Sequence, residues 1–179
     1  MTGTVRIWDP LVRLFHWSLV ASIAIAWITA EEWDRLHEQV GYLALGLVAF
    51  RVVWGFVGTR YARFANFVRG PSTVLAYAGD VLGGRDRRYL GHNPLGALMI
   101  LALVLSVAAT GITGWLMTTD AFWGSEAMEE VHEAFAVLIL CLAAVHVGGV
   151  VLSGMRHGEN LIHAMVTGKK RAPETGDVA

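Results

Sequence analysis

Charged residues are scarce in this chain. Asp, Glu, Lys and Arg make up 16% of its 179 residues, whereas a soluble globular protein carries about 25%. Hydrophobic residues make up 55%, and the mean hydropathy is +0.50. The polar surface is therefore too small to cover so large an apolar mass. The composition excludes a soluble globular domain and predicts a protein that is covered by lipid.

Cysteine is almost absent. Cys141 is the single cysteine, which excludes an internal disulfide, and the Cys-x-x-Cys-His sequence that attaches a c-type haem does not occur. Any haem would therefore be bound non-covalently. Cys141 lies in the middle of an apolar run, where we expect a small, buried hydrophobic side chain.

Four apolar runs are long enough to cross a membrane, because a spanning helix needs about 20 mostly apolar residues. They lie near residues 11–30, 38–57, 94–117 and 131–153. The segment before the first run is too polar for a signal peptide, and no small-residue cleavage pattern follows that run, so we expect it to remain as a span. With no competing strand periodicity, we predict an all-α integral membrane four-helix bundle over residues 1–171, followed by a frayed polar tail at 172–179.

Local signals support two helix starts and one further helix. Asp9-Pro10 and Asn93-Pro94 each place a capping side chain before a proline that suits the first helical position. Residues 71–82 carry apolar side chains at helical spacing, which predicts a short helix. This helix either lies in the membrane interface or is an ordinary loop helix.

Basic residues are concentrated in the segments that would share one side of the membrane. Most of the 14 Lys and Arg residues lie there: Arg6, Arg13, Arg60, Arg63, Arg69, Arg85, Arg87, Arg88, Arg156, Lys169, Lys170 and Arg171. The other two connecting segments hold only Arg35 among many acidic residues: Glu31, Glu32, Asp34, Glu38, Asp120, Glu126, Glu129, Glu130 and Glu133. The positive-inside rule therefore predicts that both termini are cytoplasmic.

Four of the seven histidines lie at matching depths. His132 and His146 are 14 residues apart in the fourth run, about 21 Å along a helix and nearly four turns, so their rings project from about the same face. His37 opens the second run from the side on which His132 opens the fourth. His16 lies about a turn and a half into the first run from the opposite side. These depths pair His37 with His132 and His16 with His146.

Two facing histidines are what a six-coordinate haem requires, because imidazole is a good axial ligand and bundles hold cofactors between facing helices. Two pairs predict two haems. Taken singly, His37 and His132 are better interpreted as interfacial residues, each followed by a glutamate. His16 and His146 are harder to dismiss, since ionisable residues inside a span are rare and functional. The matched depths favour the two-haem interpretation.

Arg51 and three glycines extend this pattern. Arg51 lies 14 residues after His37, about 21 Å farther along the helix, at the depth of the other histidine pair. A charge there needs a partner, either a haem propionate or lipid headgroups reached by an extended side chain. Gly41, Gly111 and Gly114 either let a porphyrin approach the helices or let the helices pack closely.

Six short motifs surround these residues: RLFHW at 13–17, LHEQVGY at 36–42, GHNPLGALM at 91–99, VHEAFA at 131–136, AAVHVGGV at 143–150 and GENLIHAMVTGKKR at 158–171. Together they make the chain, over about residues 5–171, resemble the bacterial cytochrome b561 and hydrogenase-type b-cytochrome family. The resemblance implies a four-helix protein of the bacterial cytoplasmic membrane with two b-type haems. It also implies the axial ligands, which fall on His16, His37, His132 and His146.

The resemblance further implies electron transfer between the membrane quinone pool and a redox partner, which we expect to be periplasmic. The main hypothesis is a di-haem electron carrier, with a quinone site of its own at the inner face near His16, His92 and Arg51. The alternative is a haem-containing anchor subunit of a larger redox enzyme such as a hydrogenase, although the short outer loops leave little to clamp one. A transporter is least favoured, because no repeat with paired broken spans is present.

The acidic segments bear on the choice of partner. They either attract a basic protein, such as a periplasmic c-type cytochrome, or only satisfy the topology and solvate the loops. The net charge of −1 gives no support for a nucleic-acid partner. No catalytic side chain is assigned, because the haems would carry the chemistry.

Overall fold

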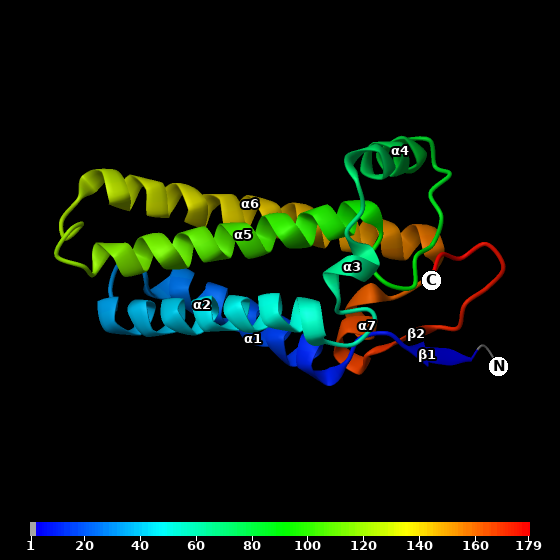
Figure 1. The fold of residues 1–179 in the computed structure, drawn as a ribbon, viewed down its shortest axis with the longest axis horizontal. Helices are drawn as coiled ribbons and strands as arrows, with labels where there is room; N and C mark the ends of the chain where they lie inside the picture. Colours follow the sequence, from blue (N-terminus) through cyan, green and yellow to red (C-terminus); the bar gives the residue numbers. More distant parts are fainter. Residues whose placement is uncertain (1–2) are drawn as a thin grey trace. The chain divides into compact units, whose positions relative to one another are not determined.

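The computed structural model describes residues 3–179, and most of them are helical. In chain order the elements are β1 Thr4–Arg6, α1 Pro10–Thr29, α2 Asp34–Val57, α3 Phe64–Phe67, α4 Pro71–Leu82, α5 Pro94–Met117, α6 Glu126–His157, α7 Leu161–Thr167 and β2 Lys169–Arg171 (Figure 1). Four helices, α1, α2, α5 and α6, are long and apolar enough to cross a membrane. The prediction of an all-α bundle with four spans is confirmed.

The boundaries of α1 and α5 follow the prediction to within one residue, α2 begins at Asp34 rather than near residue 38, and the largest difference is in α6. This helix begins at Glu126 rather than near residue 131 and ends at His157 rather than near residue 153. Glu126 and Glu129 lie in its first turn and Arg156 in its last, where each charge is stabilised by the helix dipole. The charged ends therefore terminate the apolar run but not the helix. His132 consequently lies well inside α6, and the expectation that it opens the helix is wrong.

The long helices expose apolar side chains over most of their surface. Only 6% of the most apolar stretch of α6 is buried, and Ile28 of α1, Phe56 of α2 and Leu105 of α5 are 68–79% exposed. Such surfaces suit contact with lipid. Cys141 belongs to this exposed surface. The expectation of a buried cysteine is wrong, because its position on α6 is not one that other helices cover.

The described chain forms two compact units. Unit 1 joins the residues up to Arg13 with Trp54–Leu101 and Val145–Ala179, and unit 2 joins Leu14–Val53 with Ala102–Ala144. Each long helix contributes residues to both units. The core of unit 2 includes Val40, Ala44 and Val48, one turn apart along α2.

Unit 1 contains the predicted helix starts. The Oδ1 atom of Asp9 accepts a hydrogen bond from the backbone N–H of Val12 at 3.0 Å, and Oδ1 of Asn93 accepts one from Gly96 at 2.7 Å. Both capping predictions are confirmed. The other carboxylate oxygen of Asp9 accepts from the hydroxyl of Thr59 at 2.6 Å. Burial raises the pKa of Asp9, but these hydrogen bonds outweigh it and lower the pKa below its ordinary value.

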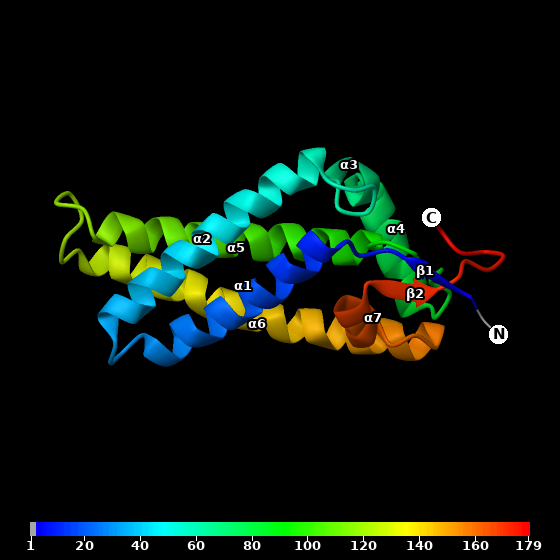
Figure 2. The same ribbon diagram turned by 90° about the horizontal axis from the view of Figure 1, so that it is seen from below.

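Unit 1 also contains a small sheet that the sequence did not predict. β1 and β2 pair antiparallel, with Val5 opposite Lys170, and they lie side by side in Figure 2. The C-terminal tail continues this non-local pairing. The N–H of Val178 donates to the carbonyl of Arg88, and the N–H of Leu90 donates to the carbonyl of Val178, each at 2.9 Å. The expectation of a frayed tail is wrong, because its backbone is hydrogen-bonded to the segment before α5.

A buried ion-pair cluster fastens the tail. The guanidinium of Arg88 is 2.7 Å from Glu159 and also contacts Asp177, while the ammonium of Lys170 is 3.1 Å from Glu159. The side chains of this cluster are 4–11% exposed. Burial raises the pKa of Glu159, but the hydrogen bond from Arg88 and the charge of Lys170 outweigh it and lower the pKa below its ordinary value.

The helix predicted at residues 71–82 is confirmed as α4, with the same bounds. Its side chains divide between two environments: Tyr77 is buried, whereas Leu75 is 72% exposed and Leu82 is 89% exposed. An apolar surface on so short a helix favours the interfacial alternative, in which the exposed leucines enter the lipid.

Candidate functional site

Unit 2 brings together two of the predicted site residues. The imidazole rings of His37, in the first turn of α2, and His132 of α6 have their centroids 6.1 Å apart, with an angle of 69° between the ring planes. Each side chain is partly buried. The pairing inferred from the sequence is thus present as a direct contact.

His37 is held by the end of α1. Its Nδ1 lies 2.8 Å from the carbonyl oxygen of Ala26. Ala26 is in the last turn of α1, where carbonyl groups lack a backbone partner within the helix, and its oxygen also accepts from the hydroxyl of Thr29 at 3.3 Å. A carbonyl can only accept, so the Nδ1–H of His37 donates to it.

His132 is held by α5. Its Nδ1 lies 3.2 Å from the hydroxyl oxygen of Thr113. That hydroxyl donates its own proton within α5, to the carbonyls of Ala109 at 2.9 Å and Thr110 at 3.0 Å. The oxygen of Thr113 is therefore the acceptor, and the Nδ1–H of His132 is the donor.

Both imidazoles consequently have Nδ1 engaged and Nε2 left as the basic nitrogen. This is the state of a histidine that binds a metal through Nε2, since a hydrogen bond at the other nitrogen fixes the tautomer and the ring orientation. Two imidazoles that share one metal ion through bonds of about 2 Å have ring centres about 6 Å apart. The separation of the His37 and His132 rings agrees with that arrangement.

The pair suits a haem better than a bare metal ion. Among residues 3–179 no group of three or more His, Cys, Asp or Glu side chains is arranged to hold a metal. A porphyrin supplies the remaining ligands itself, so two histidines are sufficient. His37 and His132 therefore fit the axial positions of a haem.

The predicted glycines have different surroundings. A side-chain carbon on Gly114 would lie 3.1 Å from Cε1 of His132, so this glycine makes room for the histidine. A carbon on Gly111 would lie 3.2 Å from Leu45, which supports the alternative of close helix packing. A carbon on Gly41 would meet no other described atom within 4 Å, which leaves space one turn after His37.

The other predicted histidine pair is divided between the units. His16 belongs to unit 2 and stacks edge-on against Trp17, with centroids 5.0 Å apart, whereas His146 belongs to unit 1. Both are partly buried. Arg51, in unit 2, is only 3% exposed, which disfavours the alternative that its side chain extends to lipid headgroups.

His92 has an aromatic environment in unit 1. Its ring centroid is 4.6 Å from that of Trp8 and 4.8 Å from that of Phe67. The hydropathy pattern gave no signal of this arrangement, because the three residues lie far apart in the sequence. A second histidine of this unit, His157, contacts Asp86 at 3.1 Å.

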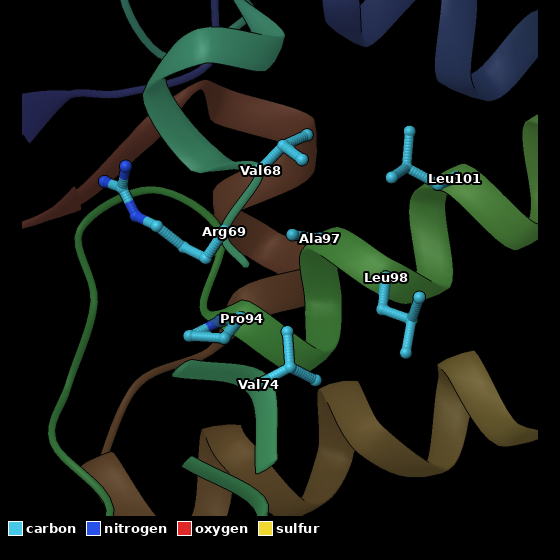
Figure 3. Close-up of a pocket in the computed structure, with 7 residues that line it drawn as sticks. All are labelled: Val68, Arg69, Val74, Pro94, Ala97, Leu98 and Leu101. Carbon is cyan, nitrogen blue, oxygen red and sulfur yellow. The ribbon is translucent and has the colours of Figure 1, made fainter. Parts of the chain in front are cut away.

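A small apolar pocket lies at the start of α5 in unit 1. Figure 3 shows this pocket, in which Val74 of α4 lies beside Pro94 of α5. Its volume is about 40 Å³, whereas pockets for small organic ligands occupy about 300–1,000 Å³. This pocket therefore does not identify a quinone site.

Exposed acidic side chains surround the end of unit 2 that holds His37 and His132. We call this group the acidic rim, and it consists of Glu31, Glu32, Asp34, Glu126, Glu129 and Glu130. The rim comes from the α1–α2 turn with the start of α2, and from the start of α6. In Figure 1 the α1–α2 turn and the α5–α6 loop lie at the same end of this unit. A concentrated negative charge there favours approach of a positively charged partner.

Comparison with known proteins gives a family for the chain. A family model described as prokaryotic cytochrome b561 matches residues 7–168. No curated protein and no solved structure matches the chain. The matched range includes both histidine pairs and the cluster residues up to Glu159.

Proposed function

The chain belongs to the prokaryotic cytochrome b561 family, and we propose that it is a di-haem carrier that moves electrons between the quinone pool and a periplasmic partner. Membership makes it a membrane b-type cytochrome of electron transfer, and its four apolar helices agree with a multi-pass protein. Bound haem supplies reversible one-electron chemistry, while the chain supplies its position and surroundings.

The His37–His132 contact is the observation that supports this proposal most directly. The two rings come from different helices, and each has Nδ1 hydrogen-bonded, so each presents Nε2. The space beside Gly41 adds room for a planar ligand next to His37. We assign the axial positions of one b haem to these two histidines.

The second haem is assigned from the sequence to His16 and His146. His146 follows His132 by 14 residues in α6, so both project from about the same face of that helix. Arg51 is buried and positively charged, and its guanidinium is suited to bind a haem propionate. Arg51 would thus bind a propionate at the edge of this haem and would not be a ligand of its iron.

We infer that quinone chemistry takes place at the cytoplasmic side, around His92. The excess of Lys and Arg assigns this side, with both termini, to the cytoplasm of a bacterial inner membrane. Quinone reduction consumes protons, and an imidazole is a group that can donate and recover them. The aromatic rings of Trp8 and Phe67 both contact the His92 ring and give it a partly apolar setting.

The haem content of the purified chain tests the proposal. We expect two b haems per chain from the haem-to-protein ratio, and reduction of both in the reduced-minus-oxidised spectrum. His37→Ala and His132→Ala should each remove one haem, and the same one. His163→Ala is the matched control, because His163 is exposed and belongs to neither pair. A chain without haem, or one that keeps two haems in both variants, would refute the proposal.

A second measurement distinguishes the carrier from an anchor subunit. A carrier accepts electrons from a quinol without other subunits, whereas an anchor depends on the enzyme it binds. We therefore expect a soluble quinol analogue to reduce the haems of the purified chain. Reduction only in the presence of a co-purifying subunit would favour the anchor.

A further inference from the structure

We propose that Thr113 is a positioning residue for His132, and that its hydroxyl lowers the reduction potential of the haem held by His37 and His132. The inference rests on the proposed function. It concerns α5, the one spanning helix from which the sequence predicted no histidine ligand. Thr113 touches the ligand and not the iron.

The direction of the hydrogen bond follows from the surroundings of Thr113. The side chain is buried, at 9% exposure, and its hydroxyl donates to Ala109 and Thr110 in the preceding turn. Its lone pair is left facing Nδ1 of His132 at 3.2 Å. The imidazole proton is therefore held on Nδ1, and Nε2 is the nitrogen that remains to bind a metal.

This contact affects the electron density on the ligand. An acceptor at Nδ1–H makes Nε2 more basic, and a more basic ligand stabilises the oxidised iron. His37 has the equivalent acceptor in the carbonyl of Ala26, which no side-chain substitution removes. The imidazole of His132 also has the backbone carbonyl of Thr110 as an acceptor, which a side-chain substitution leaves in place. Thr113 therefore supplies the side-chain part of this hydrogen bonding, and it can be changed without changing a ligand.

The neighbouring glycine supports the same assignment. A side-chain carbon at Gly114 would lie 3.1 Å from Cε1 and 3.4 Å from Nδ1 of His132. α5 thus presents the hydroxyl of Thr113 and, beside it, the space left by Gly114 to the ring of His132. The two residues together fix both the hydrogen bond and the position of that imidazole.

The test is a potentiometric titration of the purified holoprotein and three variants. Thr113→Val keeps the shape and removes the hydroxyl, Thr113→Ser restores a hydroxyl, and Thr110→Val is the matched control. The hydroxyl of Thr110 donates to the carbonyl of Ser106 at 2.9 Å, the same kind of bond one turn earlier, and no contact of that hydroxyl with His132 is found.

In Thr113→Val we expect both haems to be retained and one midpoint potential to rise while the other stays constant. Loss of one hydrogen bond should change the ferric–ferrous equilibrium by up to about tenfold, and a tenfold change corresponds to about 59 mV for one electron. The electron paramagnetic resonance signal of one ferric haem should shift as well. Thr113→Ser should restore the wild-type values, and Thr110→Val should leave them unchanged.

The outcomes separate this inference from the proposed function. If His132→Ala loses one haem but Thr113→Val changes neither the potentials nor the resonance signals, the role of Thr113 is overturned and the carrier stands. If His132→Ala keeps both haems, the haem assignment itself fails. If Thr113→Val loses a haem, the midpoint potentials are measured in Thr113→Ala instead, because alanine also lacks the hydroxyl and leaves more room for the ring. An unshifted potential in that variant would likewise overturn the inference.

Discussion

A histidine that binds iron through Nε2 needs an acceptor for its Nδ1 proton, and unit 2 supplies two kinds. Ala26 offers a backbone carbonyl because α1 ends just beyond it, and Thr113 offers a hydroxyl whose own proton is already donated. Hydrogen bonds at this position orient the ring before any ligand is bound. The site around His37 and His132 is thus organised by neighbours from two other helices, α1 and α5.

The second histidine pair gives the first prediction. His16→Ala and His146→Ala should each remove one haem, the same one in both variants, because loss of either ligand leaves the iron with one protein ligand. The haem of His37 and His132 should be retained. Separate midpoint potentials in a redox titration identify which haem is lost. Loss of different haems from the two variants would show that the pairing is wrong.

The sequence predicted that His37 and His132 lie together, but not which groups hydrogen-bond to them. Helical spacing and the side of entry into each span were enough to match His37 with His132, because both quantities depend on residue number alone. The partners of Nδ1 depend on where α1 ends and on how α5 is rotated about its axis. Hydropathy does not determine either one, so Ala26 and Thr113 carried no signal.

At the scale of elements, the long helices were predicted from the sequence and the short helices and strands were missed. The four spans and α4 repeat an apolar pattern over at least 12 residues, and each was predicted. α3, α7, β1 and β2 have three to seven residues, too few for a periodic pattern. The pairing of β1 with β2 also joins the two ends of the chain, a contact that no local sequence pattern encodes.

Docking of the tail gives the second prediction. Arg88→Ala should destabilise the protein by about 3–5 kcal/mol, because it leaves the buried carboxylates of Glu159 and Asp177 without their main partner. Thermal unfolding in detergent measures the loss. Arg87→Ala is the control, since Arg87 donates only to the exposed carbonyl of Gly176. Equal stabilities for the two variants would contradict the prediction.

The same cluster makes stability depend on pH. The pKa of Glu159 is lower in the folded protein than its ordinary value of 4.5, so its contribution is complete above pH 4.5 and is lost as the pH falls below that value. We expect the melting temperature to fall as the pH is lowered below 4.5. The fall should be shallower in Arg88→Ala, in which the carboxylate has lost the hydrogen bond that lowers its pKa.

At the scale of the whole molecule, the charge distribution predicts the topology. Cysteines introduced one at a time between residues 59 and 92, in a Cys141→Ser background, should react with an impermeant reagent only from the cytoplasmic side. Six arginines in this segment set the direction. Cys141 must be replaced first because it is exposed on α6. Labelling of the segment in intact cells would show that the orientation is the opposite one, with the two haems on exchanged sides of the membrane.

The acidic rim predicts how a periplasmic partner approaches. Its six carboxylates are exposed at the end of unit 2 that holds His37 and His132, so a basic protein such as a c-type cytochrome would be steered toward that haem. Charge at such a surface raises the association rate more than the final affinity. The alternative is that these acids only solvate the loops, in which case no partner responds to them.

Salt dependence separates the two alternatives, because a Debye length of about 10 Å at 0.1 M screens steering over longer distances. We expect the rate at which a basic cytochrome c oxidises the haem to fall as ionic strength rises. A variant with Glu126, Glu129 and Glu130 changed to Gln should react more slowly at low salt and depend less on salt. Glu174→Gln, an acidic residue of the tail, should behave like wild type. A wild-type rate that is flat with salt and unaffected by the triple substitution would exclude the rim as a docking surface.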